Sequence, residues 1–358
     1  MKQLFEAMMQ DKAIEKIGVC FAKEHGQNLV YGLAGSQKHA IMAASYDRYP
    51  RTTIIITSNQ DAIGKWQADL AMLLPNVPIL ELPAIDVVTF SVVAKSIALA
   101  AKRMEVLGRL MRKEPVIVLA STAAAVQKGL SRQDFERSSV HLTIGESTGR
   151  DELLLKLIQL GYERVQQVES LGQFSARGGI VDIFPINSLH PIRMEFFDET
   201  IDSLREFAIE TQRSLQNISS VAILPLEQLD NNGNPAIFLS YLEKQATVIF
   251  DEPTIAQDLA GRELIKSIIR KLKSEGKIVL TIIHDMDFVA EIFERTIVFA
   301  KGNVLLDSDT RDVFSKKEIL EKAYLEQPSV TKLCRALGYE ETFLTVNEFI
   351  EFRKNIHI

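Results

Sequence analysis

The pattern of hydrophobic and polar residues changes its period near residue 134. Before that point, short apolar runs alternate with stretches in which apolar residues recur at helical spacing. The first such stretch predicts an amphipathic helix over residues 3–24. The elements expected after it are strand 28–31, strand 52–57, helix 61–74, strand 77–80, helix 95–112 and strand 116–120. Strands separated by helices are typical of a parallel sheet.

From residue 134 to residue 224 the expected elements are shorter. A strand at 140–144 and a helix at 151–160 lead into several strand-like runs between residues 165 and 224. Glycines, a proline and polar turns interrupt these runs. Such close spacing predicts an antiparallel sheet inserted into the α/β scaffold.

The remainder of the chain returns to the earlier pattern. The run from Thr247 to Phe250 has the apolar character of a strand that is buried on both faces of a parallel sheet. The other elements expected here are a short helix and turn at 235–245, a helix at 259–275, a strand at 277–283, a strand and hairpin at 294–304 and a helical tail.

Composition describes an ordinary soluble globular protein and narrows the function classes. At 358 residues the chain is long enough for about two or three domains. The net charge is −6 and no basic block occurs, so we expect no extensive nucleic-acid footprint. Cys20 and Cys334 are isolated, which argues against a disulfide framework or a zinc site and favours a reducing cytoplasm. Neither a signal peptide nor a transmembrane segment is expected.

Asp251 and Glu252 follow the buried strand that begins at Thr247. Ligands of open α/β sheets bind at the carboxyl ends of strands, so the pair predicts a Walker B site. Asp251 would bind Mg²⁺ and Glu252 would orient the attacking water. His284, at the end of the next expected strand, could contact a γ-phosphate, although a lone histidine more often has a structural role. The plain alternative for the pair is a strand followed by a turn.

Residues 32–39, GLAGSQKH, have the length of a P-loop but depart from it at two positions. Gln37 replaces the second glycine, and His39 replaces the serine or threonine that would bind Mg²⁺. Lys38 remains. We interpret the segment as a relic P-loop, and we expect no cofactor. Trp66 lies among helical apolar positions and is expected in the core.

An ordered motif runs through the antiparallel region. It reads GQFSARGGIVDIFP over residues 172–185 and IRMEFFDETIDSLR over residues 192–205, followed by TQR at 211–213. This motif resembles the UvrA-interaction domain that UvrB shares with the transcription-repair coupling factor. Together with the relic P-loop, it makes residues 1–252 similar to the UvrB-like amino-terminal module of that factor, in which the ATPase fold has lost its nucleotide site.

The resemblance implies UvrA as a partner and places the contact residues at Arg177, Arg193 and Phe197. Arginines and aromatic residues are also the types enriched at interface hot spots. Without the resemblance, each arginine would more simply form an ion pair at the surface or within its own domain, and Phe197 would be a core residue. The carboxylates available locally for such pairs are Asp182, Glu195, Asp198 and Glu199.

Residues 246–358 resemble a different family, the carboxyl-terminal half of an ABC-transporter ATPase of the energy-coupling-factor type. The resemblance rests on DEPT at 251–254 as Walker B, IAQD at 255–258 as D-loop and His284 as the switch histidine. No intact Walker A, Q-loop or LSGGQ sequence occurs, so neither half of the ATP sandwich of that family is present.

This second resemblance implies ATP and Mg²⁺ as ligands. If the chain is an ATPase, Glu252 and His284 would be catalytic, Lys38 and Asp258 would bind ATP, and Asp251 would bind the metal. We expect no enzymatic activity, because the relic P-loop has lost two of its roles.

The fold expected from these features is α/β. A P-loop-NTPase-like parallel sheet is interrupted by an inserted α+β UvrA-interaction domain and followed by a helical tail. The expected parts are a UvrB-like domain at 1–133, the UvrA-interaction domain at 134–224, a Walker B and switch-histidine segment at 225–300, and a terminal hairpin with helices at 301–358.

The leading hypothesis is a cytoplasmic UvrA-docking module of transcription-coupled nucleotide excision repair that lacks the translocase motor. The alternative is the ATP-binding subunit of an ABC importer, whose partners would be membrane transporter subunits. A third possibility is a non-functional hybrid whose fold survives. The sequence leaves open whether the join near residue 246 is natural and whether the two half-sites share one sheet.

Overall fold

The computed structural model describes residues 1–22, 26–31, 35–84, 93–226, 236–255, 257–300 and 303–356. The chain forms two compact units. The first comprises Met1–Leu80, Pro115–Thr122 and Glu243–Ile358, and the second comprises Glu81–Glu114 and Ala123–Leu242. The four-part division expected from the sequence stays a prediction.

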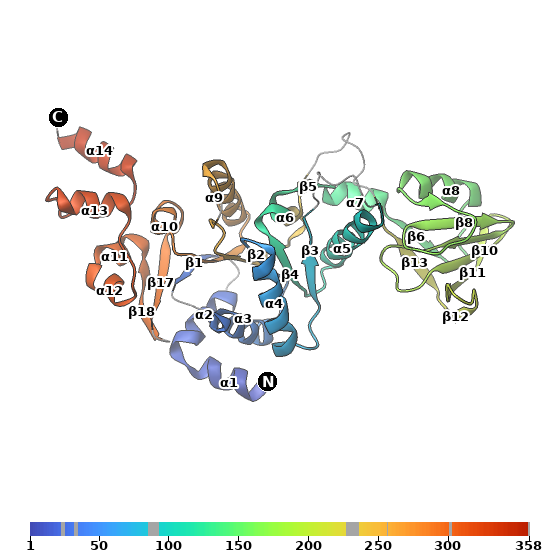
Figure 1. Ribbon diagram of the computed structural model, residues 1–358, viewed down its shortest axis with the longest axis horizontal. Coiled ribbons are helices and arrows are strands. Elements are labelled where there is room, and N and C mark those ends of the chain that lie inside the picture. The colour runs from blue at the N-terminus through green and yellow to red at the C-terminus, as the bar shows by residue number, and fades with distance from the viewer. Residues whose placement is uncertain are drawn as a thin grey trace. The chain divides into compact units, whose positions relative to one another are not determined.

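An eight-stranded sheet in the described part of the chain forms the centre of the first unit (Figure 1). Its order is β18-β17-β1-β16-β15-β2-β4-β3. The strands are β1 (Gly26–Tyr31), β2 (Thr53–Thr57), β3 (Ile79–Leu82), β4 (Ile117–Ser121), β15 (Thr247–Asp251), β16 (Ile278–Ile282), β17 (Arg295–Ala300) and β18 (Asn303–Asp309). The pairings from β17 to β4 are parallel, and β17 pairs antiparallel with β18.

Strands from distant parts of the sequence meet in this sheet. β1 pairs with both β16 and β17, and β15 pairs with both β16 and β2. Val248, for example, lies opposite Ile54 on one side and Val279 on the other. All three are fully buried, as expected for strands covered on both faces. The segments before and after residue 246 therefore share one sheet, which the sequence left open.

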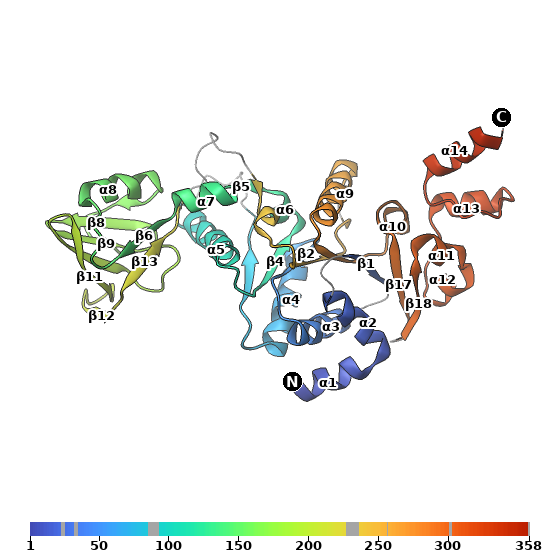
Figure 2. The same ribbon diagram turned by 180° about the vertical axis from the view of Figure 1, so that it is seen from behind.

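Helices lie on both sides of the sheet. Figure 2 shows α2, α3 and α4 on one side and α9 on the other, as does Figure 1. The helices of this unit are α1 (Lys2–Gln10), α2 (Lys12–Ala22), α3 (Ser36–Arg48), α4 (Gln60–Leu73), α9 (Leu259–Ser274), α10 (Met286–Ile292), α11 (Thr310–Ser315), α12 (Lys317–Lys322), α13 (Ser329–Ala336) and α14 (Val346–Ile356). Trp66 on α4 is fully buried, which confirms its expected place in the core.

The single helix predicted over residues 3–24 is wrong, because it is interrupted at Asp11. The backbone of Asp11 is extended, with φ −70° and ψ 123°. Its Oδ1 accepts a hydrogen bond from the backbone N–H of Ile14 at 3.2 Å. Aspartate commonly caps a helix start in this way, because its oxygen satisfies an N–H group that has no partner within the helix. The prediction's last two residues lie outside the described ranges.

The second unit contains a six-stranded sheet with the order β12-β11-β10-β9-β8-β7. Its pairings are antiparallel except that β7 and β8 are parallel. The strands are β7 (Glu163–Arg164), β8 (Gln173–Arg177), β9 (Ile180–Ile183), β10 (Ile192–Phe197), β11 (Thr200–Phe207) and β12 (Ser214–Asn217). The antiparallel sheet predicted between residues 165 and 224 is thus confirmed for β8 to β12.

Two short pairs of strands and several helices complete this unit. β6 (Val140–Thr143) pairs with β13 (Ser220–Ile223), and β5 (Lys128–Gly129) pairs with β14 (Ala236–Ile237). The helices are α5 (Val93–Met111), α6 (Thr122–Val126), α7 (Arg132–Ser138), α8 (Arg150–Gln159) and the 3₁₀ helix η1 (Phe238–Tyr241).

The other predicted strands and long helices agree with the observed ones to within about two residues, except that the hairpin predicted over 294–304 extends to Asp309. Among the described residues, no helix combines the length and the apolar character needed to cross a bilayer.

Shortening the side chain of Leu280 tests whether the eight strands unfold as one cooperative unit. Leu280 is fully buried on β16, opposite Asn28 of β1 and Ile249 of β15. Leu280→Ala should lower the free energy of unfolding by about 2–5 kcal/mol, because it leaves a cavity in the sheet core. Hydrogen exchange should show that amides of β2 lose protection together with those of β16.

Leu305→Ala is the matched control, because Leu305 lies on the terminal strand β18 and is partly exposed. It should cost less than about 1 kcal/mol. Unchanged protection of β2 in the Leu280 variant would show that the two parts of the sheet unfold independently.

Candidate partner-binding face and relic nucleotide site

A row of polar side chains crosses one face of the six-stranded sheet. Its members are cross-strand neighbours on β8, β9, β10 and β11, namely Ser175, Asp182, Arg193 and Arg205. Side chains alternate between the two faces of a strand, so the residues next to them in sequence belong to the other face. The buried apolar residues among these neighbours are Phe174, Val181, Ile183, Ile192, Met194 and Leu204.

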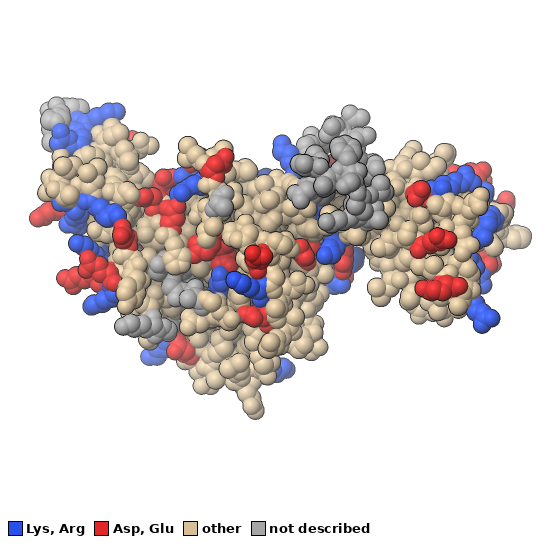
Figure 3. Space-filling view, viewed as in Figure 1, with Lys and Arg blue, Asp and Glu red and all other residues tan. Residues whose placement is uncertain are grey.

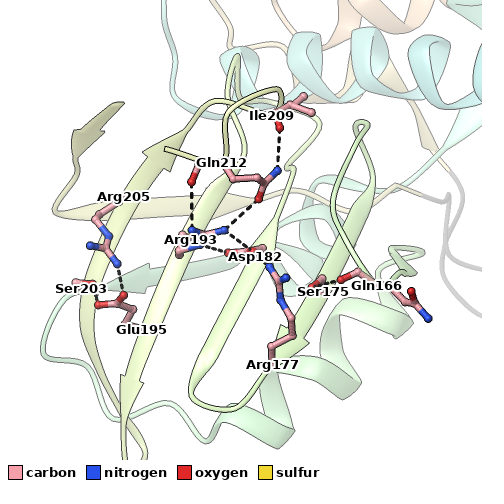
Figure 4. A network of polar contacts seen from close by, with 10 residues as sticks. All are labelled: Gln166, Ser175, Arg177, Asp182, Arg193, Glu195, Ser203, Arg205, Ile209 and Gln212. Atoms are coloured by element: carbon pink, nitrogen blue, oxygen red, sulfur yellow. Dashed lines mark hydrogen bonds and ion pairs between the residues drawn. The ribbon is translucent and has the colours of Figure 1, made fainter. Parts of the chain in front are cut away.

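Asp182 is the buried centre of this row, with a side chain that is 2% exposed. Its Oδ1 accepts a hydrogen bond from Nε of Arg193 at 2.7 Å. Its Oδ2 accepts from Nη2 of Arg193 and from Nη2 of Arg177, each at 2.9 Å. Figure 4 shows the two guanidinium groups reaching the same carboxylate. We call Arg177, Asp182 and Arg193 the Asp182 cluster.

Arg193 is held from several directions. Besides its bidentate contact with Asp182, its Nη2 donates to Oε1 of Gln212 at 3.3 Å. Its guanidinium carbon lies 4.6 Å from the ring centroid of Phe207, within the range of a cation–π contact. The hydrogen bond with Asp182 raises the pKa of Arg193. The side chain is 17% exposed, so Arg193 mainly makes contacts within the sheet.

Arg177 and Phe197 are the accessible members of the predicted contact set. The side chain of Arg177 is 54% exposed, and Phe197 is 79% exposed. Arg177 ends β8 just before the turn at Gly178 and Gly179. A Cβ on Gly179 would lie 2.9 Å from the backbone oxygen of Phe196, so a glycine is needed there. The turn after β8 therefore lies against the end of β10 that carries Phe197.

The structure tests the simpler alternatives that the sequence offered for these side chains, namely internal ion pairs and a core position. Arg177 and Arg193 both form ion pairs inside their own unit, with Asp182 as the shared partner. Phe197 is not a core residue. Whether the three residues contact a partner stays a prediction.

The sequence analysis did not identify Gln212, Phe207 or the pair formed by Arg205 and Glu195. Arg205 donates to Glu195, which also accepts from Oγ of Ser203 at 2.9 Å. The TQR motif at residues 211–213 was the signal for Gln212. On the surface drawn in Figure 3, charged side chains of both signs are interspersed.

The predicted nucleotide-site residues meet in the first unit. Lys38 lies in the first turn of α3, and its Nζ donates to both oxygens of Asp251, at 2.7 and 2.6 Å. Nε1 of Trp66 donates to Oδ2 of Asp251 at 2.8 Å. The Asp251 side chain is 3% exposed. The lysine and the carboxylate expected to hold phosphate and metal are therefore bonded to each other.

His39 also has protein partners. Its Nδ1 lies 2.6 Å from Oδ2 of Asp69, and its ring lies 4.0 Å from that of Trp66. Burial lowers the pKa of His39. No group of three or more His, Cys, Asp or Glu side chains able to hold a metal ion occurs within the described ranges. Lys38 and His39 thus contact protein carboxylates at the positions where phosphate and Mg²⁺ were expected. Residues 32–34 of the P-loop-like segment lie outside the description.

Glu252 and His284 contact each other at the adjacent strand ends, with 3.0 Å between Oε1 and Nε2. Glu252 has a positive φ of 51°, and its side chain is 18% exposed. Burial, and then the charge of Asp251, raise the pKa of Glu252 to about 7. Burial lowers the pKa of His284. Both shifts favour the neutral forms of the two groups.

Asp258 has a structural role that the sequence analysis did not assign. It precedes α9, and its Oδ1 accepts a hydrogen bond from the backbone N–H of Gly261 at 2.7 Å. This is a helix cap. Residue 256, within the D-loop-like segment, lies outside the described ranges, and nucleotide binding by Asp258 stays a prediction.

The raised pKa of Glu252 predicts a dependence of stability on pH. Its folded value of about 7 lies above the ordinary value of 4.5, so the folded protein retains a proton that the unfolded chain releases. Stability should fall as the pH rises between these two values. Glu252→Gln removes this contribution. From pH 5 to pH 8 the variant should therefore lose less free energy of unfolding than the wild type, by on the order of 1–3 kcal/mol.

Urea unfolding at several pH values measures this difference. Glu6→Gln changes an exposed glutamate of α1 and should follow the wild-type curve. Parallel curves for the wild type and Glu252→Gln would show that Glu252 ionises normally in the folded protein.

Comparison with known proteins identifies similarity in the region of the polar sheet face. Residues 140–229 match the family model of the UvrB interaction domain. The chain is 32% identical over 203 residues to the transcription-repair-coupling factor of Bacillus subtilis (strain 168), which covers 57% of this chain and 17% of that protein. The corresponding protein of Staphylococcus haemolyticus (strain JCSC1435) is 31% identical over 216 residues, or 60% of this chain and 18% of that protein.

The matches to these factors are partial. The chain spans about a sixth of the length of the curated relatives it matches. The segment that matches the family model nevertheless contains the whole Asp182 cluster and Phe197. The sheet that carries these residues is therefore similar to a UvrB interaction domain.

Proposed function

We propose that this protein docks UvrA through the six-stranded sheet, as a coupling-factor-like module of transcription-coupled nucleotide excision repair. The observation that carries the proposal is the match of residues 140–229 to the UvrB interaction domain, together with the exposure of Arg177 and Phe197 in that segment. Such a role belongs in the cytoplasm.

The exposed side chains support docking on physical grounds. Arg177 is charged and held by a buried carboxylate, while Phe197 offers a large apolar surface at the neighbouring turn. An arginine with reduced freedom and an exposed aromatic ring are the anchors that carry most of the binding energy in many interfaces. Arg193 contributes through the Asp182 cluster, and its smaller exposure leaves less surface for direct contact.

The alternative is an ATP-binding subunit of an ABC importer. It is favoured by the meeting of Lys38, Asp251, Glu252 and His284 near one edge of a shared sheet. However, phosphate binding by Lys38 would require it to leave Asp251, which would then need a metal to replace its charge. His39 is bonded to Asp69 and offers no hard oxygen ligand. We therefore prefer the docking function.

Charge reversal at Arg177 tests the docking function. Arg177→Glu should weaken binding of purified UvrA by about 2 kcal/mol or more, because it replaces an anchoring cation by an anion. Isothermal titration calorimetry with the full chain measures this change. Arg137→Glu is the matched control, since Arg137 is exposed on α7 and lies before the segment that matches the family model. Equal affinities of wild type and Arg177→Glu would remove the assignment.

A steady-state ATPase assay separates the two functions. We expect no hydrolysis above background with Mg²⁺ and ATP, because phosphoryl transfer depends on positioned phosphates and metal, and Lys38 and Asp251 neutralise each other. Glu252→Gln should give the same background. Hydrolysis by the wild type that Glu252→Gln abolishes would replace the docking proposal by the ATPase alternative.

A further inference from the structure

We infer that the Asp182 cluster is a preformed binding site for a carboxylate side chain of the docking partner, with Arg177 as the contact residue and Asp182 as a positioning residue. The identity of the partner as UvrA rests on the proposed function. The chemistry of the site follows from the charges and hydrogen bonds of the cluster itself.

The Asp182 cluster contains more positive than negative charge. Two guanidinium groups share one carboxylate in the cluster, which leaves one net positive charge, since +2 − 1 = +1. On the same face, Arg205 and Glu195 pair one to one. The cluster itself therefore carries one net positive charge, and a partner that supplies an anion beside Arg177 would balance it.

The hydrogen bonds show which arginine can receive that anion. Arg193 directs its Nε and Nη2 at Asp182 and contacts Gln212 as well. Arg177 makes one hydrogen bond to Asp182, through Nη2, and its side chain is half exposed. Within the cluster, Arg177 therefore uses one of its five N–H donors. The planar guanidinium group can direct two parallel N–H donors at the two oxygens of a carboxylate.

Asp182 reduces the freedom of Arg177 before a partner arrives. A free arginine side chain loses rotamer entropy when it is immobilised in an interface. Here a buried carboxylate, itself fixed by the bidentate contact with Arg193, already holds one edge of the Arg177 guanidinium. Arg193 thus acts on the partner through Asp182 and Arg177.

Replacing Asp182 separates positioning from net charge, because the two effects have opposite signs. Asp182→Asn makes the face more positive, so charge alone would strengthen binding of an anionic partner group. The same change releases Arg177, so loss of positioning would weaken binding. We expect affinity for UvrA to fall about tenfold despite the added positive charge.

A double-mutant cycle with UvrA tests this expectation by titration calorimetry on the full chain. Asp182→Asn and Arg177→Ala should each weaken binding about tenfold, and the double variant should bind no more weakly than Arg177→Ala. Glu195→Gln makes the same change of charge on the same face, beside Arg205, and should alter affinity by less than about threefold. Thermal unfolding of each variant reports whether the fold is retained.

Arg177→Lys provides a second test that does not disturb the buried carboxylate. It keeps the charge but loses the fork, so affinity should fall about fivefold. Additive effects in the cycle, tighter binding by Asp182→Asn, or unchanged binding by Arg177→Lys would overturn the carboxylate site while UvrA docking stands. No binding of UvrA by the wild type would overturn both the docking function and this inference.

Discussion

The need to compensate a buried negative charge organises the six-stranded sheet. An ionised carboxylate inside a protein is costly unless paired and hydrogen-bonded groups surround it. Asp182 meets this requirement with two arginines from the neighbouring strands β8 and β10. The compensation ties three strands together through side chains as well as through the backbone ladder. The two arginines together carry one positive charge more than the carboxylate needs. One of them, Arg177, therefore belongs to the buried network although its side chain is half exposed.

The same requirement has the opposite consequence at Asp251. There a single lysine and the indole N–H of Trp66 satisfy the carboxylate, and the balance of charge is zero. This hydrogen-bonded pair would have to separate before Lys38 could bind phosphate or Asp251 a metal ion. The two buried aspartates thus differ in the net charge of their surroundings. The ion pairs of Asp182 include the accessible cation of Arg177, whereas the ion pair of Asp251 with Lys38 has no net charge.

The sequence predicted the positions of strands and helices better than the contacts between side chains. Apolar runs and helical periodicity located β2, β4, β15 and β16, because those signals are local. The break at Asp11 was missed, since the apolar stripe continues through a residue that caps the next helix. Lys38 and Asp251 were each identified as candidates, but their bond joins residues 213 positions apart and depends on strand order. The sharing of Asp182 likewise depends on the register of β8, β9 and β10, which no single motif encodes.

The distribution of local and distant pairings has a consequence for folding. In the six-stranded sheet, β8 to β12 follow one another in sequence and pair with their neighbours, so its contacts close short loops. In the eight-stranded sheet, β1 lies between β16 and β17, whose residues follow it by about 250 positions. Closing such distant contacts is slower, because chain entropy is lost before the strands gain their hydrogen bonds. The order of the chain therefore favours formation of the Asp182 cluster before the sheet that contains Asp251.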